Sequence, residues 1–437
     1  MVKIYTLSLL ILSSAILYGQ RLNITFSPAG ASPTVDSVRA TNLRTNEHVT
    51  LPGNDTLFLF YSSGINNVPG LSRQGTVFPN PFAGRTTFVA DIQKAQTVSL
   101  EVFNLAGRSV AHSQVVVQPG VQSFSISLSK TGVYVVSMIT DTEKASFKII
   151  CTGSAETGDG IDYTGTATDN GKFVSLKETD IYSLGYAAGD IILYRCRGGV
   201  HTTIITDSPT DSKNYTVTFA SCADPDGKNY AIVKVGTQTW MAENLAWLPA
   251  VSDSSKGSDS LPYFYVYDYE GSSVAEAKNT ANYKRFGVLY NWIATMIPGS
   301  SNKGMQGKSL SVCPAGWHLP HDEDWKILET TLGMTEHDAD SIYLRNSGNV
   351  GSKLKSTLAW PEDGNGSNFS GFTALAGGYR NTHGSFNRLG TYALFWTATE
   401  SDTLSWYRSL YSGDSGVFRL KTLRSHGFSV RCLKDSY

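Results

Sequence analysis

The chain has 437 residues, which is too long for one compact core, so about two to four domains are expected. Charged residues make up only 17%, the formal net charge is -1, and no run of Lys or Arg forms the basic stripe of a nucleic-acid-binding protein. The 41 glycines indicate turn-rich β structure.

Residues 1–19 have the pattern of an export signal. Lys3 gives a positive start, Leu7–Leu17 is mostly apolar, and Gly19 offers a small residue at the cleavage point. The apolar run is shorter than the about 20 residues that span a bilayer, and no cysteine follows it to carry a lipid anchor. With no other transmembrane segment in the sequence, we expect a secreted protein or one on the outer surface of a Gram-negative bacterium.

The first half of the chain is a series of short strand patterns. All eight tryptophans lie at or after Trp240, which separates two kinds of core. Residues 21–72 hold "LNITFSPAG" and "DTLFLFYSSG" and are expected to form a short β segment, half of a sandwich. Residues 151–220 begin with a Gly-rich linker and continue with strand patterns. They predict a small β module or an extension of the segment before it.

Residues 75–150 predict a β-sandwich, because apolar side chains alternate in strand-length runs separated by turns, as at Val98, Leu100 and Val102. The words "FPNPF", "VFNLAGR" and "KTGVYVV" resemble the type IX secretion sorting domain of the Bacteroidetes. In that family the domain ends the chain, whereas here residues 151–437 follow it. We therefore expect a sandwich that is not removed as a sorting tail, and a plain immunoglobulin-like spacer is the alternative to a sorting role.

Residues 222–437 carry "DPDGKNYAIVKVGTQTWMAENLAW", "GVLYNWIAT", "CPAGWHLPHDEDWKILE", "FSGFTALAGGYR", "FWTATESD" and "GFSVRCLKD" in order. These blocks resemble the Fibrobacter succinogenes major paralogous domain, which also occurs in surface proteins of the Bacteroidetes. The resemblance implies an α+β domain like a C-type lectin. The expected architecture is thus multidomain, with all-β sandwich-like modules before this domain.

Two helices are predicted in this domain. One covers Gly287–Met296, and the other covers Asp322–Leu332 with apolar residues at i, i+3 and i+7. Family members usually have Thr before the second helix. His321 stands there in this chain, so Asp322 is expected to be the N-cap.

Export favours pairing among the five cysteines, none of which has a CxxC spacing. Cys313 and Cys432 flank the most recognisable blocks of the paralogous-type domain, and a bridge between them would stabilise the fold by about 4–5 kcal/mol. Cys196 and Cys222 are the candidates for a second bridge, which leaves Cys151 unpaired. Buried thiols are the alternative.

No metal or other cofactor is expected. One candidate metal site consists of His318, His321, Asp322 and Asp324. However, a proline lies between the two histidines, and a predicted helix begins directly after them. A core histidine and a helix cap therefore explain this segment. Asp224–Asn229, "DPDGKN", looks like part of a calcium loop, yet the Glu of loop position 12 is missing. A turn is the favoured interpretation and calcium the alternative.

We expect no enzyme. The domain distantly resembles the formylglycine-generating enzyme group, whose oxidase chemistry needs two nearby cysteines that bind copper, and Cys432 has no such partner near the end of this chain. Nucleophile-elbow, P-loop and dinucleotide motifs are missing, as are the EPN, QPD and WND triplets of calcium-dependent lectins. Glu400 and Asp402 have the pattern of a loop, without an evident catalytic partner.

Aromatic and Arg residues in the Gly-rich C-terminal third are the remaining candidates for a site. We predict ligand binding by Tyr379, Arg380, Trp406 and Tyr411, with the alternative that Trp406 and Trp396 are core. The expected function is non-enzymatic binding of carbohydrate or a surface protein. A polysaccharide-active enzyme and a purely structural surface protein are the alternatives.

Overall fold

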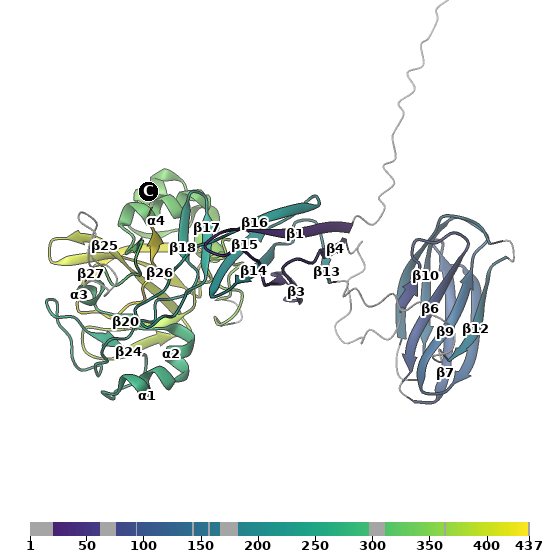
Figure 1. The fold of residues 1–437 in the computed structure, drawn as a ribbon, viewed down its shortest axis with the longest axis horizontal. Coiled ribbons are helices and arrows are strands. Elements are labelled where there is room, and N and C mark those ends of the chain that lie inside the picture. The colour runs from purple at the N-terminus through teal and green to yellow at the C-terminus, as the bar shows by residue number, and fades with distance from the viewer. Residues whose placement is uncertain are drawn as a thin grey trace, which may run out of the picture. The chain divides into compact units, whose positions relative to one another are not determined.

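The computed structural model describes residues 21–61, 76–92, 94–141, 144–155, 158–166, 182–296, 311–361 and 364–435. The signal-peptide prediction falls on residues 1–19 and lies outside them. The chain divides into two compact units, Met1–Ser63 with Ile181–Tyr437, and Gly64–Asp180 (Figure 1). Among the described residues, no helix is both long and apolar enough to cross a bilayer.

The unit within Gly64–Asp180 is a sandwich of two four-stranded sheets, in the orders β11-β10-β7-β8 and β12-β9-β6-β5. Its strands are β5 (Thr76–Phe78), β6 (Arg85–Ile92), β7 (Gln96–Asn104), β8 (Ser109–Val117), β9 (Gly120–Ser127), β10 (Gly132–Ile139), β11 (Lys144–Cys151) and β12 (Gly160–Thr166). The alternation seen in the sequence puts Val98, Leu100 and Phe124 into one core. The sandwich continues past residue 150, because β12 pairs with β9.

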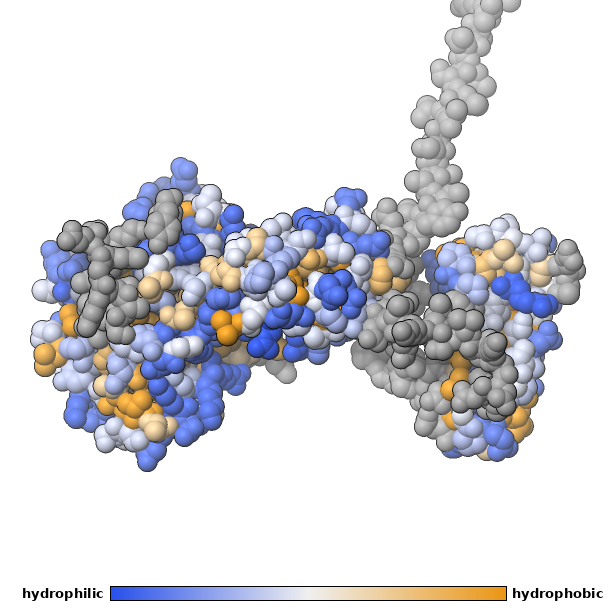
Figure 2. Space-filling model, in the orientation of Figure 1, coloured by the Kyte–Doolittle hydropathy of each residue, from blue (hydrophilic) through white to orange (hydrophobic). Residues whose placement is uncertain are grey.

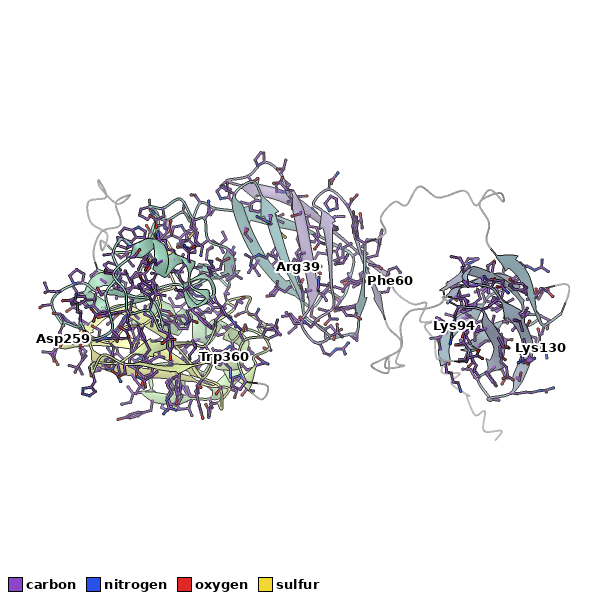
Figure 3. The ribbon with its side chains drawn as sticks, turned by 90° about the horizontal axis from the view of Figure 1, so that it is seen from below. Arg39, Phe60, Lys94, Lys130, Asp259 and Trp360 are labelled. Carbon is purple, nitrogen blue, oxygen red and sulfur yellow. A yellow bond between two sulfur atoms is a disulfide. The ribbon has the colours of Figure 1, made fainter. Side chains whose placement is uncertain are left out.

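The two β segments on either side of this sandwich in the sequence form one layered structure. β1 (Arg21–Gly30) and β4 (Leu57–Tyr61) join β13 (Ser183–Tyr186) and β16 (Lys213–Phe219) in a sheet of order β13-β4-β1-β16. β2 (Ser37–Asn42) and β3 (His48–Pro52) join β14 (Ile192–Gly198) and β15 (His201–Asp207) in a second sheet. The division into separate segments at 21–72 and 151–220 is therefore corrected. Figure 3 shows Arg39 of β2 and Phe60 of β4 on these two sheets.

The second sheet continues into the C-terminal domain. Its order is β21-β28-β18-β17-β15-β14-β2-β3, with β17 (Ile232–Val235), β18 (Gln238–Met241), β21 (Trp317–His318) and β28 (Leu433–Lys434) on the C-terminal side. β15 and β17 run parallel and pair only at Thr203–Ile232 and Ile204–Val233. This short junction ties the N-terminal layers to the C-terminal domain.

A six-stranded sheet of order β22-β27-β26-β25-β23-β24 forms the other half of the C-terminal domain. Its strands are β22 (Tyr343–Arg345), β23 (Gly377–Arg380), β24 (Phe386–Leu389), β25 (Tyr392–Ser401), β26 (Leu404–Tyr411) and β27 (Val417–Leu423). Around it lie β19 (Phe264–Tyr265), β20 (Leu289–Tyr290), the 3-10 turn η2 (Ser347–Asn349) and the short helices α1 (Val274–Asn279), α2 (Ala281–Phe286), α3 (Trp292–Thr295), α4 (Asp322–Thr331), α5 (Glu336–Asp340) and α6 (Val350–Leu354). On the coloured part of the face in Figure 2, hydrophilic residues prevail and hydrophobic ones form small separate groups.

The prediction of one helix over Gly287–Met296 is wrong. Gly287 has a φ of 75° and ends α2, and Leu289–Tyr290 form β20 against β19. A helix begins only at Trp292, where the Asn291 side chain accepts a hydrogen bond from the Ala294 N–H. The apolar residues of this run lie in a short strand inside the domain. Their burial there was mistaken for the buried stripe of a helix.

The second predicted helix is confirmed as α4, although its N-cap is His321 and not Asp322. The His321 N–H donates to the Asp324 carboxylate at 2.7 Å, which satisfies one of the free amides at the helix start. Asp322 is the first helical residue. Its carboxylate is buried and accepts hydrogen bonds from Arg408 and Arg419.

The predicted Cys313–Cys432 bridge is present, with an S–S distance of 2.02 Å. The second bridge is wrong, because Cys196 and Cys222 are free buried thiols, as is Cys151. Cys196 packs in the core of the N-terminal layers, whereas Cys222 belongs to a core of the C-terminal domain. Burial raises the pKa of the Cys196 thiol to about 12, which keeps it protonated and unreactive.

Candidate functional site

Arg380 was predicted from the sequence to bind a ligand, but its side chain binds backbone groups inside the domain. Its side chain is buried at 1% exposure. The guanidinium donates to the backbone carbonyls of Ser254, Lys256 and Ser425 at 2.7–2.9 Å. Ser254 and Lys256 lie on one loop and Ser425 lies on another, so these bonds join β23 to two loops. The assignment of Arg380 to ligand binding is therefore corrected.

Trp406 is separated from the other predicted residues by the pleat of β26. Consecutive residues of a strand point to opposite faces, so Trp406 lies on the face opposite Tyr407 and Tyr411. There its ring is covered by the Arg419 guanidinium at 4.0 Å and the Lys421 ammonium at 4.6 Å. Trp396 is fully buried, which agrees with the alternative that it is a core residue. Its indole N–H donates to the Tyr290 carbonyl at 2.8 Å.

The opposite face of this sheet carries a hollow of about 310 Å³ that we call the aromatic hollow. It is lined by residues of β23, β25, β26, β27 and the segments next to them: Tyr379, Arg388, Tyr392, Leu394, Tyr407, Ser409, Phe418, Leu420, Thr422, His426 and Phe428. Tyr411 stacks on Tyr392 with ring centroids 4.8 Å apart. Of the four predicted residues, the structure brings Tyr379 into the hollow and Tyr411 beside it.

The aromatic hollow offers neutral polar groups between its rings. Burial raises the pKa of Tyr407 to about 12, so its phenol is protonated at neutral pH. Burial together with the charge of Arg380 lowers the pKa of His426, which leaves that imidazole uncharged. Arg388 is the exposed cation of the lining, 5.9 Å from the Tyr392 ring. None of the described lining residues is Asp or Glu.

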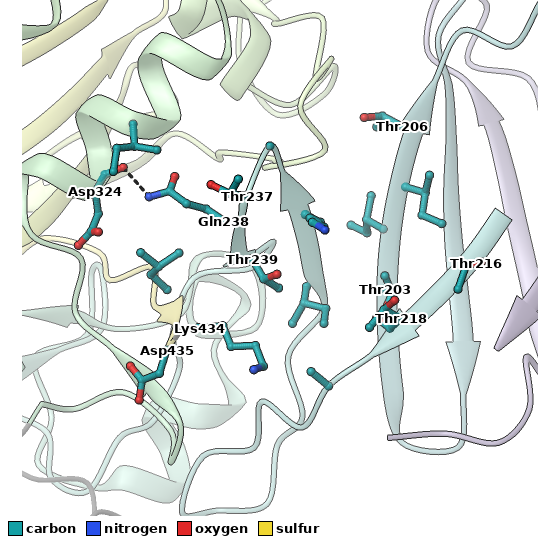
Figure 4. Close-up of a pocket in the computed structure, with 18 of the residues that line it drawn as sticks. Thr203, Thr206, Thr216, Thr218, Thr237, Gln238, Thr239, Asp324, Lys434 and Asp435 are labelled. Carbon is teal, nitrogen blue, oxygen red and sulfur yellow. Dashed lines mark hydrogen bonds between the residues drawn. The ribbon is translucent and has the colours of Figure 1, made fainter. Parts of the chain in front are cut away.

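A second and larger cavity, of about 800 Å³, opens where β15 and β17 diverge (Figure 4). We call it the threonine cleft, because Thr203, Thr206, Thr216, Thr218, Thr237 and Thr239 all line it. At one end His318 Nδ1 lies 2.6 Å from Asp435, and Nε2 lies 3.6 Å from Asp324. Burial opposes a charge on His318, but the hydrogen bonds to the two carboxylates prevail and raise its pKa.

The metal interpretation of the His-rich segment finds no support in this geometry. Asp435 and Asp324 meet opposite nitrogens of His318, so the three groups do not converge on one point. Across the described residues, no cluster of three or more His, Cys, Asp or Glu is arranged to hold a metal ion.

The "DPDGKN" segment is a turn. The Asp224 carboxylate accepts the backbone N–H groups of Asp226 and Lys228 and the hydroxyl of Tyr230. The Asp226 carboxylate pairs with Lys278 at 2.7 Å. The carboxylates of Asp224 and Asp226 thus hold the turn and its surroundings together through hydrogen bonds and an ion pair.

Tyr392 was missed as a site residue, and Tyr407, although one of the candidate aromatics of the C-terminal third, was not among the four residues predicted to bind. The words "YALFW" and "WYRSLY" contain the relevant signal, because strand alternation puts Tyr392 and Leu394 on one face and Tyr407 and Tyr411 on the same face of the next strand. The threonine cleft had no such signal, since its walls come from segments far apart in the sequence.

Comparison with known families agrees with both sequence resemblances. Residues 233–434 match the Fibrobacter succinogenes major domain, and residues 76–152 match the secretion system C-terminal sorting domain. No curated protein matches the chain. The sorting domain indicates a secreted or outer-surface protein. Here that domain is inserted between β4 and β13, two neighbouring strands of one sheet.

Proposed function

We propose that this protein is a non-enzymatic surface protein whose lectin-like C-terminal domain binds carbohydrate in the aromatic hollow. The observation that carries the proposal is the clustering of partly exposed tyrosines and Phe418 on one sheet face around a concave surface. The C–H face of a sugar ring packs on such aromatic faces, and its hydroxyls need neutral donors and acceptors. The phenols, Ser409, Thr422 and the neutral His426 supply these groups.

The size of the aromatic hollow favours a small ligand. A volume of about 310 Å³ lies at the lower end of the ~300–1,000 Å³ typical of small-molecule sites. This volume suits one or two sugar units of a chain rather than a folded protein partner. The exposed Arg388 at the rim adds a donor for a hydroxyl or a carboxylate of the sugar.

A polysaccharide-cleaving enzyme fits this site less well than a binding protein. Most glycosidases need two carboxylic residues that flank the scissile bond, and the described lining of the aromatic hollow has no Asp or Glu. The nearby Glu400 is held by Arg424 at 2.6 Å. We also propose that binding needs no calcium, because Asp224 and Asp226 are engaged within the protein.

Binding should depend on the tyrosines of the aromatic hollow. Tyr379→Ala and Tyr392→Ala should each weaken binding on a glycan array about tenfold, which corresponds to about 1.4 kcal/mol of lost ring contact. Tyr343→Ala is the matched control, because Tyr343 is 65% exposed on β22 and does not line the hollow. Equal affinities of all three variants, or an array without any bound glycan, would remove the basis of the proposal.

We further propose type IX secretion from a Gram-negative bacterium of the Bacteroidetes kind, after removal of a signal peptide. The support is the sorting domain together with Lys3 and the apolar run after it. N-terminal sequencing of the exported protein is expected to start at Gln20. A mature protein that retains Met1 would contradict the signal peptide.

A further inference from the structure

The threonine cleft begins where the long sheet comes apart. β15 and β17 pair at Thr203–Ile232 and Ile204–Val233, and beyond these residues both strands continue without pairing to each other. Four consecutive residues of β15, 203–206, line the cleft. Because consecutive side chains point to opposite faces of a strand, this wall is a backbone edge rather than one face of a sheet.

β16 contributes a second backbone edge. It is the last strand of its sheet, and β1 is its one neighbour among the described strands. The Phe219 carbonyl accepts from the Ala31 N–H on the β1 side, whereas the Thr218 carbonyl accepts from the Thr203 hydroxyl on the cleft side. Backbone groups of alternate residues point the same way, so the N–H and C=O of Thr216 also face the cleft.

The side chains of the threonine cleft differ from those of the aromatic hollow. They are mainly β-branched or aliphatic, with Ile204, Ile205, Ile232 and Ile327 among them, and Tyr215 is the one Phe, Tyr or Trp of the described lining. Such walls suit the side chains of an extended peptide better than a sugar ring.

The charges of the threonine cleft favour an acidic occupant. A protonated His318 offsets only one of the two negative charges of Asp324 and Asp435. Lys234 and Lys434 also line the cleft, so the charges of its described lining then sum to +1. The Lys234 side chain is exposed on the wall and has no ion-pair partner among the described carboxylates. One acidic side chain of an occupant would complement it at short range.

We propose that the threonine cleft binds an extended segment of another protein, which adds to the free edge of β16 as an extra strand. Main-chain hydrogen bonds to Thr216 would give affinity, and the apolar walls would select β-branched side chains at alternate positions. An acidic residue of the segment would pair with Lys234. This site is independent of the proposed carbohydrate site, since the two share no lining residue.

Proline at Thr216 provides the test, because it removes the N–H that faces the cleft and leaves the bonds of β16 to β1 in place. A random nonapeptide library displayed on phage is selected on the full chain. Enriched peptides should alternate β-branched residues and carry an acidic one. They should bind Thr216→Pro about tenfold more weakly, Thr216→Ala nearly as well as the wild type, and Lys234→Gln more weakly.

Hydrogen exchange of the unaltered protein provides a readout that needs no proline variant. A selected peptide should slow exchange of the Thr216 amide, which the free edge leaves to solvent. The proposal is overturned if no peptide is enriched, if Thr216→Pro folds and binds the selected peptides as well as Thr216→Ala does, or if exchange at Thr216 is unchanged by saturating peptide.

Discussion

Replacing Glu329 with Gln should lower the free energy of unfolding by about 3–5 kcal/mol, the usual cost of removing one partner from a buried ion pair. Glu329 is fully buried on α4, where its carboxylate accepts from Arg408 at 2.7 Å and from both terminal nitrogens of Arg345 at 2.7 Å. The variant keeps the shape of the side chain but leaves the buried Arg345 guanidinium without its carboxylate and leaves Arg408 with the Asp322 carboxylate alone. Urea unfolding of the full chain measures the loss.

Glu323→Gln is the matched control, since Glu323 lies on the same helix with its side chain 75% exposed and paired with Lys326 at 2.7 Å. An exposed pair of this kind contributes about 0–1 kcal/mol, so the control should unfold nearly as the wild type does. If the two variants lost similar stability, the buried network would not have the importance that its geometry implies.

The same network predicts how stability responds to acid. Burial opposes ionisation of Asp322, but Arg419 and Arg408 outweigh it and lower its pKa to about 2. A carboxyl group with a lowered folded pKa stabilises the fold above its unfolded pKa of 3.8, and this contribution is lost as the pH falls from there towards 2.

Breaking the Cys313–Cys432 bridge should have the second large effect. The bridge closes a loop of 119 residues, for which the chain-entropy model gives about 4–5 kcal/mol. Dithiothreitol should therefore lower the melting temperature of the wild type sharply. The double variant Cys313→Ala/Cys432→Ala should melt low with or without the reductant.

Cys222→Ala is the control for this experiment, because Cys222 is a free thiol in the same core as the two bridged cysteines. It should keep the response to dithiothreitol. A wild type whose melting temperature is insensitive to full reduction would show that the bridge adds little to stability.

Local patterns in the sequence predicted much of the fold, and long-range contacts account for what was missed. The α4 stripe and the alternation in β7 were visible, because each depends on residues close together in the chain. The run over Gly287–Met296 was misread because an apolar segment buried inside a domain has the same composition as a helix or as a strand. The pairing of β1 with β16 joins residues on either side of an inserted domain, and no local pattern reports it.

The candidate site shows the same limit. Tyr379 and Tyr411 were predicted from composition and do lie in or beside the aromatic hollow. Arg380 follows Tyr379 directly and has the same surroundings in sequence, yet three carbonyl groups from distant loops bury it. Whether an Arg in a Gly-rich segment meets solvent or carbonyl groups depends on those loops, and the sequence does not place them.

The position of the sorting-type sandwich between β4 and β13 bears on how this protein responds to proteolysis. A domain at the end of a chain is released by a single cut. Here a single nick at either border would leave the sandwich covalently attached through its other border. The pieces on both sides of the nick would also stay associated, because β1 pairs with β16 and β4 with β13 through main-chain hydrogen bonds. Release requires two cuts, and the product would be a two-chain protein held together by its own sheets.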